Sequence, residues 1–134
     1  MKRTYIDSSV LITAARGTAS NCARAMEVLD DPDREFVTSN FVELEVVPKA
    51  AYMRSNDELE FYKTFFEGCV KRVEGTRDIL RRGYREAVAH GLSAMDALHV
   101  VSAADGKAVE LVTLEQPTKP MHRTTLIRIA CLDS

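Results

Sequence analysis

Four acidic residues that lie far apart in the sequence could act together in metal-dependent chemistry. Asp7 ends one short β-prone run and Glu115 directly follows another, while Glu45 and Asp96 lie near the starts of predicted helices. In an open parallel sheet, sites form beyond the carboxyl ends of the strands. If the chain folds into such a sheet, all four carboxylates meet at one edge.

Such a cluster needs a counter-charge. Two carboxylates about 4 Å apart repel by about 4 kcal/mol at an effective dielectric constant near 20. Either some of the acids are protonated or a cation lies among them. Oxygen-only donors select hard ions such as Mg²⁺ or Mn²⁺, and these ions support the hydrolysis of phosphodiesters. The acids therefore indicate a divalent metal site, although their spacing alone does not say which of them are ligands.

Asp96 has the clearest functional signal and also a structural alternative. The predicted helix that begins at Ala94 is apolar on nearly every side, and its one polar line consists of Asp96, His99 and Ser102. A carboxylate on that line suggests a functional role, but Asp96 also stands three residues after Ser93, as in a capping box. We interpret His99 as a buried, hydrogen-bonded histidine and not as a catalytic base.

The other three acids also leave alternatives open. Asp7 could simply end its strand. Glu45 competes with Glu43, which lies two residues earlier on another face of the same helix. Glu115 could be an ordinary surface acid.

The segment after Glu115 offers two candidates for contact with phosphate. Lys119 and Arg123 follow it in a proline-containing loop from residue 116 to 123, near the predicted acidic edge. Basic side chains are the usual protein partners of phosphate oxygens. We therefore expect these two residues to contact a substrate, and we place Ser9, next but one to Asp7, in the same group.

Composition excludes several classes of protein. The 134 residues are 46% hydrophobic and 28% charged, with 18 basic and 20 acidic residues, so the formal net charge is −2. These values favour one globular domain spanning residues 1–134 and exclude a strongly basic nucleic-acid-binding surface over the whole chain. The three separated cysteines argue against a disulfide framework, and no apolar run is long enough for a membrane span. We expect a soluble cytoplasmic protein.

Hydrophobic periodicity predicts strands that alternate with helices. Strands are expected at residues 4–6, 35–38, 109–113 and 126–131, with a brief extended piece near Val73. Helices are expected from a Ser8 cap to a stop at Gly17, and over 19–29, 41–53, 56–70, 76–90 and 94–104. Pro48 predicts a kink or a break in the third of these helices. This order predicts an α/β fold, a three-layer α/β/α sandwich with a mainly parallel sheet of four to five strands.

Four segments together resemble the motifs of PIN domains. Ile6-Asp7-Ser8-Ser9 resembles their opening strand and first acid, and Ser39 followed by Glu45 resembles their second motif. The closest match is Gly91-Leu92-Ser93-Ala94-Met95-Asp96-Ala97-Leu98-His99, which resembles the third, and Leu111–Glu115 stands in place of the fourth. The order and spacing cover nearly the whole chain.

The resemblance implies a function. PIN domains are metal-dependent ribonucleases, and small single-domain members are often VapC-type toxins of toxin–antitoxin pairs. It implies Mg²⁺ or Mn²⁺ bound by Asp7, Glu45 and Asp96, RNA as the substrate, a homodimer and an antitoxin partner. Two positions depart from the family pattern: Ser9 stands where Asn is frequent, and Glu115 replaces Asp or Asn. We expect Glu115 to act through a water molecule or a second, weakly bound ion.

Other classes remain as alternatives. A PIN-like module that binds RNA or protein but has weak or no activity would keep the fold and part of the acidic edge. A phospho-acceptor signalling domain needs its acceptor Asp after a central strand near mid-chain, where this sequence has no clear candidate. A haloacid-dehalogenase-like phosphatase needs a second Asp at the position of Ser9.

Overall fold

The computed structural model describes residues 1–17 and 20–132. Its centre is a five-stranded sheet in which every neighbouring pair of strands is parallel. The strands are β1 (Lys2–Ile6), β2 (Arg34–Ser39), β3 (Lys71–Val73), β4 (Glu110–Thr113) and β5 (Arg128–Cys131). Their order across the sheet is β3-β2-β1-β4-β5, so the chain starts in the middle of the sheet.

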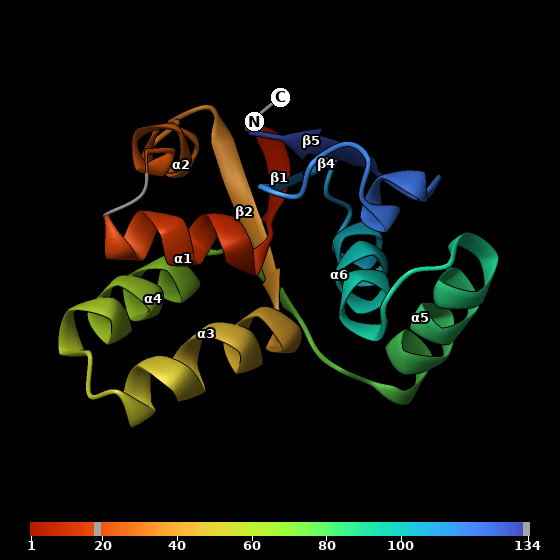
Figure 1. The fold of residues 1–134 in the computed structure, drawn as a ribbon, viewed down its shortest axis with the longest axis horizontal. Coiled ribbons are helices and arrows are strands. Elements are labelled where there is room, and N and C mark those ends of the chain that lie inside the picture. Colours follow the sequence, from red (N-terminus) through yellow and green to blue (C-terminus); the bar gives the residue numbers. More distant parts are fainter. Residues whose placement is uncertain (18–19, 133–134) are drawn as a thin grey trace.

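Helices cover both faces of this sheet, and the predicted three-layer α/β/α sandwich is confirmed (Figure 1). One layer contains α1 (Ser8–Arg16), α2 (Cys22–Leu29), α3 (Asn40–Tyr52) and α4 (Asn56–Gly68). The other contains α5 (Arg77–His90) and α6 (Ala94–Asp105), which form a helical hairpin. The predicted start of the second helix at Ala19 lies outside the described residues.

Helix ends follow the capping residues in the sequence. The hydroxyls of Ser39, Thr76 and Ser93 each accept a backbone N–H from the first turn of α3, α5 and α6. Gly17 and Gly91 end α1 and α5 in the left-handed conformation, each with φ of 66°, which residues with a Cβ adopt less readily. The predicted Ser8 cap is wrong, because the N-cap residue of α1 is Asp7.

Two further local predictions are wrong. Pro48 does not break α3 into two pieces, since the helix runs from Asn40 to Tyr52. Pro48 and Leu44, whose carbonyl loses its partner, both lie on the exposed side of α3, where water can replace the missing N–H. The helix expected over residues 56–70 ends at Gly68, and Val70, its predicted last residue, is 51% exposed.

The segment from residue 116 to 123 is not only loop. It contains a short 3-10 helix, η1 (Pro120–Arg123), whose Met121 is buried in the core. Proline is favoured at the first position of a helix because its missing N–H has no partner there anyway. No helix of the described residues is long and apolar enough to cross a membrane, and Cys22 and Cys69 are free thiols.

Candidate active site at the carboxyl edge of the sheet

Asp7 lies between the end of β1 and the start of α1 and is 6% exposed. An aspartate at an N-cap commonly accepts an N–H of its own helix, but Asp7 makes no such side-chain bond. Its Oδ2 instead accepts the hydroxyls of Ser9 at 2.7 Å and Thr113 at 2.8 Å. Among the described residues no hydrogen bond is directed at Oδ1, so this oxygen is available to a ligand.

Glu45 shows the same division of roles between its two oxygens. Oε1 accepts the Ser8 hydroxyl at 2.6 Å and lies 2.5 Å from Nε2 of His99, while within the described chain Oε2 receives no hydrogen bond. Burial alone would raise the pKa of Glu45, but the hydrogen bonds from His99 and Ser8 leave it below its usual value. Glu45 is therefore a carboxylate at neutral pH.

The alternative second acid lies elsewhere. Glu43 points away from this cluster and forms an ion pair with Arg72 at 3.0 Å on the surface. The structure thus brings Glu45, and not Glu43, to Ser8 and His99.

Asp96 lies in the first turn of α6, where its backbone N–H donates to the Ser93 hydroxyl at 3.2 Å. Burial raises the pKa of the Asp96 carboxyl, the Ser93 hydroxyl lowers it, and the negative charges of Asp7 and Glu45 raise it further. The predicted cap at Ser93 is therefore present, and the Asp96 carboxyl is also affected by the charges of the other two acids. Asp7, Glu45 and Asp96 come from β1, α3 and α6 and interact electrostatically at one edge of the sheet.

His99 is buried and hydrogen-bonded, as predicted. It is 2% exposed, and its Nδ1 lies 2.8 Å from the hydroxyl of Tyr5. Sequence reasoning missed Tyr5, Ser8 and Thr113, which hold the acids in place. Thr113 had a usable signal, because it is the last residue of a strand whose carboxyl end faces the site; Tyr5 looked like an ordinary core aromatic.

The remaining predicted site residues differ in how many hydrogen bonds their side chains form within the protein. The Ser9 hydroxyl has no hydrogen left to donate, since it donates to Asp7, and it also accepts the N–H of Leu114 at 3.2 Å. Glu115 is anchored by its backbone, whose N–H donates to Thr113 Oγ1 at 3.0 Å and whose carbonyl accepts Nε2 of His122. In the described structure its carboxylate has no ion pair, including none with Lys119 or Arg123.

Lys119 and Arg123 lie at the two ends of η1. Lys119 is exposed, and no side-chain bond of its ammonium group occurs among the residues described. Arg123 donates to the carbonyl of His90 at 3.3 Å, at the end of α5, so its guanidinium is partly held in place.

The donor chemistry of this site fits a hard divalent cation. Asp7 and Glu45 each have one oxygen fixed by two hydrogen bonds and one oxygen free of them, and Asp96 is affected by both charges. Within residues 1–17 and 20–132 no Lys or Arg forms an ion pair with any of the three. The same residues contain no ready-made group of three or more His, Cys, Asp or Glu side chains around a common metal position.

Comparison with known families identifies the chain's family. The model of the PIN domain matches residues 4–116. The chain therefore belongs to the PIN-domain family, as its motifs suggested. Comparison with curated proteins finds no match.

Solved structures to which the chain is similar include toxin–antitoxin complexes. The chain is similar to a VapBC2 structure from Rickettsia felis bound to a promoter DNA fragment, with a TM-score of 0.72, 12% identity, and 96% of this chain and 98% of that chain covered. It is similar to a toxin–antitoxin complex from Klebsiella pneumoniae, with a TM-score of 0.70 and 17% identity over 96% and 97% of the two chains. It is also similar to Mycobacterium tuberculosis VapC20, described as a sarcin-ricin loop cleaving toxin, with a TM-score of 0.69 and 14% identity over 93% and 98%. At these identities the likeness establishes the fold.

Proposed function

We propose that the protein is a metal-dependent endoribonuclease that acts as the toxin of a toxin–antitoxin pair. The observation that carries this proposal is the convergence of Asp7, Glu45 and Asp96 with no ion-paired Lys or Arg among the described residues. Membership of the PIN-domain family supports a nuclease, and the similar VapC20 structure supports RNA as the class of substrate.

Each residue has a defined part in this proposal. Asp7, through Oδ1, and Glu45, through Oε2, would hold Mg²⁺ or Mn²⁺ together with Asp96. The bound ion would provide Lewis-acid stabilisation of charge on the phosphate and favour ionisation of water. Ser9 and Thr113 keep the Asp7 carboxylate in place, and the exposed Lys119 and Arg123 would contact the RNA backbone.

An RNA cleavage assay tests the proposal. A labelled RNA is incubated with the protein over a range of Mn²⁺ concentrations, with excess EDTA as the metal-free control. Cleavage that requires Mn²⁺ and is lost in Asp96→Asn supports a nuclease. Glu43→Gln is the matched control, because Glu43 lies on the same helix as Glu45 but pairs with Arg72 on the surface.

The alternative is a PIN-like module that binds RNA or protein and has little or no activity. It predicts Mn²⁺ binding or RNA binding without cleavage products. The same assay separates the two proposals, since retained RNA binding with no turnover at any Mn²⁺ concentration would favour the module.

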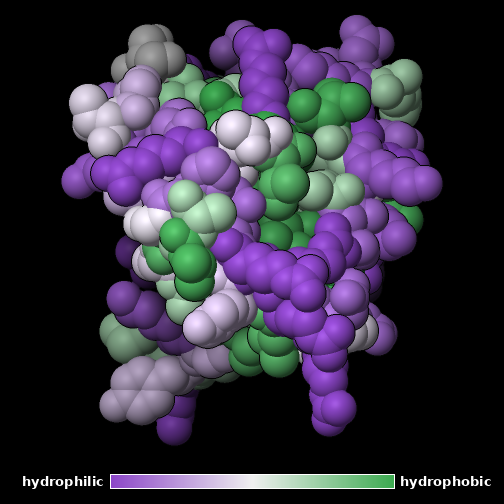
Figure 2. All heavy atoms as spheres, turned by 90° about the vertical axis from the view of Figure 1, so that its right-hand side faces the viewer, coloured by the Kyte–Doolittle hydropathy of each residue, from purple (hydrophilic) through white to green (hydrophobic). Residues whose placement is uncertain are grey.

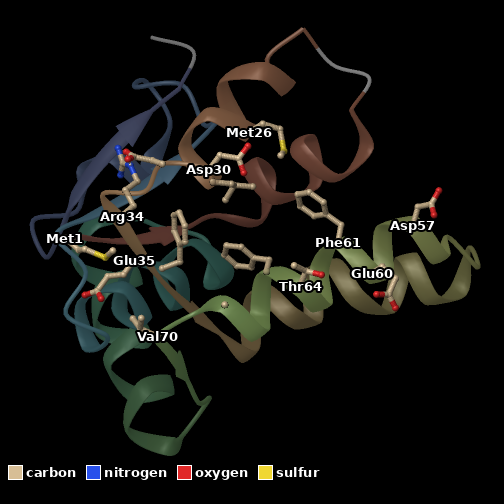
Figure 3. Close-up of a pocket in the computed structure, with 15 residues that line it drawn as sticks. Met1, Met26, Asp30, Arg34, Glu35, Asp57, Glu60, Phe61, Thr64 and Val70 are labelled. Carbon is tan, nitrogen blue, oxygen red and sulfur yellow. The ribbon is translucent and has the colours of Figure 1, made fainter.

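A groove on the opposite side of the molecule supports an antitoxin partner. It lies between α2, the start of β2 and α4 and has a volume of about 750 Å³ (Figure 3). Its apolar lining includes Met26, Leu29, Phe36, Phe61 and Phe65.

The rim of this groove is acidic. The lining contains five acids and one arginine, and within the described residues Asp30, Asp57 and Glu60 form no ion pair. A groove with an apolar floor and an acidic rim fits an amphipathic segment with basic residues along its edges. We assign this groove to a segment of the antitoxin.

Charge reversal at the rim tests that assignment. The product of a small neighbouring gene that encodes a DNA-binding protein is the candidate antitoxin, and its binding is measured by titration calorimetry. Asp57→Lys should weaken binding, whereas Glu67→Lys, on the same helix but outside the groove, should not. Equal affinities for both variants would refute the assignment.

An exposed apolar stripe on α5 supports a homodimer. Leu80, Tyr84 and Val88 are spaced by four residues and are 50%, 73% and 70% exposed. Figure 2 shows hydrophobic atoms among hydrophilic ones on the face that α5 presents. We propose that a second copy of the chain packs here; sedimentation should show a dimer that Tyr84→Arg dissociates.

A further inference from the structure

A ring of hydrogen bonds connects the Glu45 carboxylate with the start of its own helix. Nε2 of His99 lies 2.5 Å from Glu45 Oε1, and Nδ1 of the same ring lies 2.8 Å from the Tyr5 hydroxyl. That hydroxyl lies 2.7 Å from Oγ of Ser39, which accepts the N–H of Val42 as the N-cap of α3. Since α3 also carries Glu45, the ring closes through β1, β2, α3 and α6.

One pattern of donors satisfies every member of the ring while His99 is neutral. A carboxylate only accepts, so the hydrogen between Glu45 and His99 belongs to Nε2. Ser39 Oγ already accepts from the backbone and has its own hydrogen to donate to Tyr5. In that pattern Tyr5 donates to Nδ1, and His99 has its hydrogen on Nε2.

Three members of this ring, Tyr5, Ser39 and His99, are too deeply buried to contact a substrate. Tyr5 and Ser39 are fully buried and His99 is 2% exposed. A buried polar network of this kind is stabilising only when each group has a partner, and it then fixes the orientation of its members. Tyr5, Ser39 and His99 are therefore positioning residues.

We propose that the Ser39–Tyr5–His99 ring fixes the rotamer of Glu45 so that its unbonded oxygen, Oε2, is presented to the divalent ion. The inference rests on the proposed function. Asp7 is held by two hydroxyls at the site, those of Ser9 and Thr113. Glu45 has one such hydroxyl, that of Ser8, and its second partner is the core residue His99. Of the two, Glu45 depends more on a partner within the core.

The experiment measures Mn²⁺ binding without RNA, by electron paramagnetic resonance of the free ion. His99→Leu removes the donor to Glu45 and should weaken Mn²⁺ binding by about 10- to 100-fold, the usual effect of losing a group that orients a metal ligand. His99→Gln keeps an N–H donor near the position of Nε2 and should restore most of the affinity. Tyr5→Phe keeps the aromatic side chain and removes only its hydroxyl. It should weaken Mn²⁺ binding by a smaller factor than His99→Leu, since Tyr5 acts through His99.

Tyr62→Phe is the matched control. Tyr62 is also a core tyrosine, 1% exposed, but it lies on α4 away from the acids. If Tyr5→Phe and Tyr62→Phe lower the urea midpoint similarly and only Tyr5→Phe weakens Mn²⁺ binding, the effect is positional and not a general loss of stability.

A second readout does not depend on metal. Nitrogen-15 spectra of the histidine rings should show the Nε2–H tautomer for His99 in the metal-free protein and a changed Nε2–H signal in Glu45→Gln. An Nδ1–H tautomer, or unchanged Mn²⁺ affinity in His99→Leu, would overturn this inference alone. Wild-type protein that binds no Mn²⁺ would overturn the proposed function, and this inference with it.

Discussion

Both edges of the sheet hold buried carboxylates, but only one edge neutralises them. At the amino edge, Glu110 is 2% exposed and is surrounded by cations from the starts of three other strands. Its Oε1 lies 2.7 Å from Arg34 and 3.0 Å from Lys2, and Arg128 lies 3.9 Å from Oε2. Its carboxylate therefore has protein partners in place.

At the carboxyl edge no Lys or Arg of the described residues forms an ion pair with the acids. Among these residues Asp7 and Glu45 accept hydrogen bonds only from hydroxyl groups and an imidazole, and the pKa of Asp96 is raised by burial and by the two neighbouring charges. The difference separates a structural ion network from a site prepared for an external cation. A buried acid identifies a function only when the protein does not neutralise it.

The largest effect is expected at the carboxyl edge and concerns activity. Asp96→Asn should lower RNA cleavage by more than about 100-fold, because losing a group that merely orients a metal ligand already costs about 10- to 100-fold. Its folding stability should be unchanged or higher, since the substitution removes a repelled charge. Cleavage rates and urea unfolding of the same preparation measure both quantities, and wild-type activity in Asp96→Asn would contradict the comparison.

The reverse result is expected at the amino edge. Glu110→Gln should lower the free energy of unfolding by about 2 kcal/mol, less than the 3–5 kcal/mol typical of a fully buried pair because Lys2 is 43% exposed. The substitution leaves the partly buried guanidinium of Arg34 without this carboxylate. Urea unfolding gives the stability change, and cleavage by the folded variant should equal that of the wild type.

The pH dependence of stability sharpens this difference. Burial raises the pKa of Glu110, but hydrogen bonds from Arg34 and Lys2 bring it below the ordinary value of 4.5. A lowered folded-state pKa stabilises the protein fully above the unfolded-state pKa, and this contribution is lost as the pH falls through the folded-state value. The stability difference between wild type and Glu110→Gln should therefore be constant near neutral pH and shrink below about pH 4.5. A difference that grows on acidification would exclude this ion network as its source.

Much of this architecture could be predicted because the relevant signals are local. The alternation of strands with helices predicted the parallel sheet, and glycines marked the ends of helices. A parallel sheet places Asp7 and Asp96 at the same edge. The residues that orient the acids were not predicted. Tyr5 contacts Ser39 across 34 residues of sequence and His99 across 94 residues. No local pattern indicates such distant pairs.

Pro48 illustrates the opposite failure, in which a strong local rule did not decide the outcome. The rule counts a lost hydrogen bond, but it takes no account of where that bond lies. Because Pro48 is on the exposed side of α3, solvent takes the place of the missing donor while Val46 and Ala50 keep the helix packed on the core. Burial, which depends on the whole fold, determined the result.

The smallest expected effect on cleavage concerns Glu115, which lies just beyond the carboxyl end of β4 and is not one of the three proposed metal ligands. Its backbone donates to Thr113 Oγ1, which itself donates to Asp7 Oδ2, so the residue is tied to the site by two hydrogen bonds in series. In the described part of the structure its carboxylate has no ion pair with Lys119 or Arg123, and the side chain is free to reach toward a water molecule or a second ion.

Glu115→Gln should therefore lower cleavage by about 3- to 10-fold, less than Asp96→Asn, since it acts through a water or a weakly bound ion and not as a ligand of the tight one. It should also raise the Mn²⁺ concentration needed for half-maximal rate. Glu67→Gln, an exposed acid on α4 far from the edge, serves as the matched control for removing one surface charge. Activation curves of the two variants and the wild type are compared at constant ionic strength, because general electrostatic effects on RNA binding depend on salt. If Glu115→Gln and Glu67→Gln both overlay the wild-type curve, Glu115 is an ordinary surface acid, and the unneutralised charge at the carboxyl edge is confined to Asp7, Glu45 and Asp96.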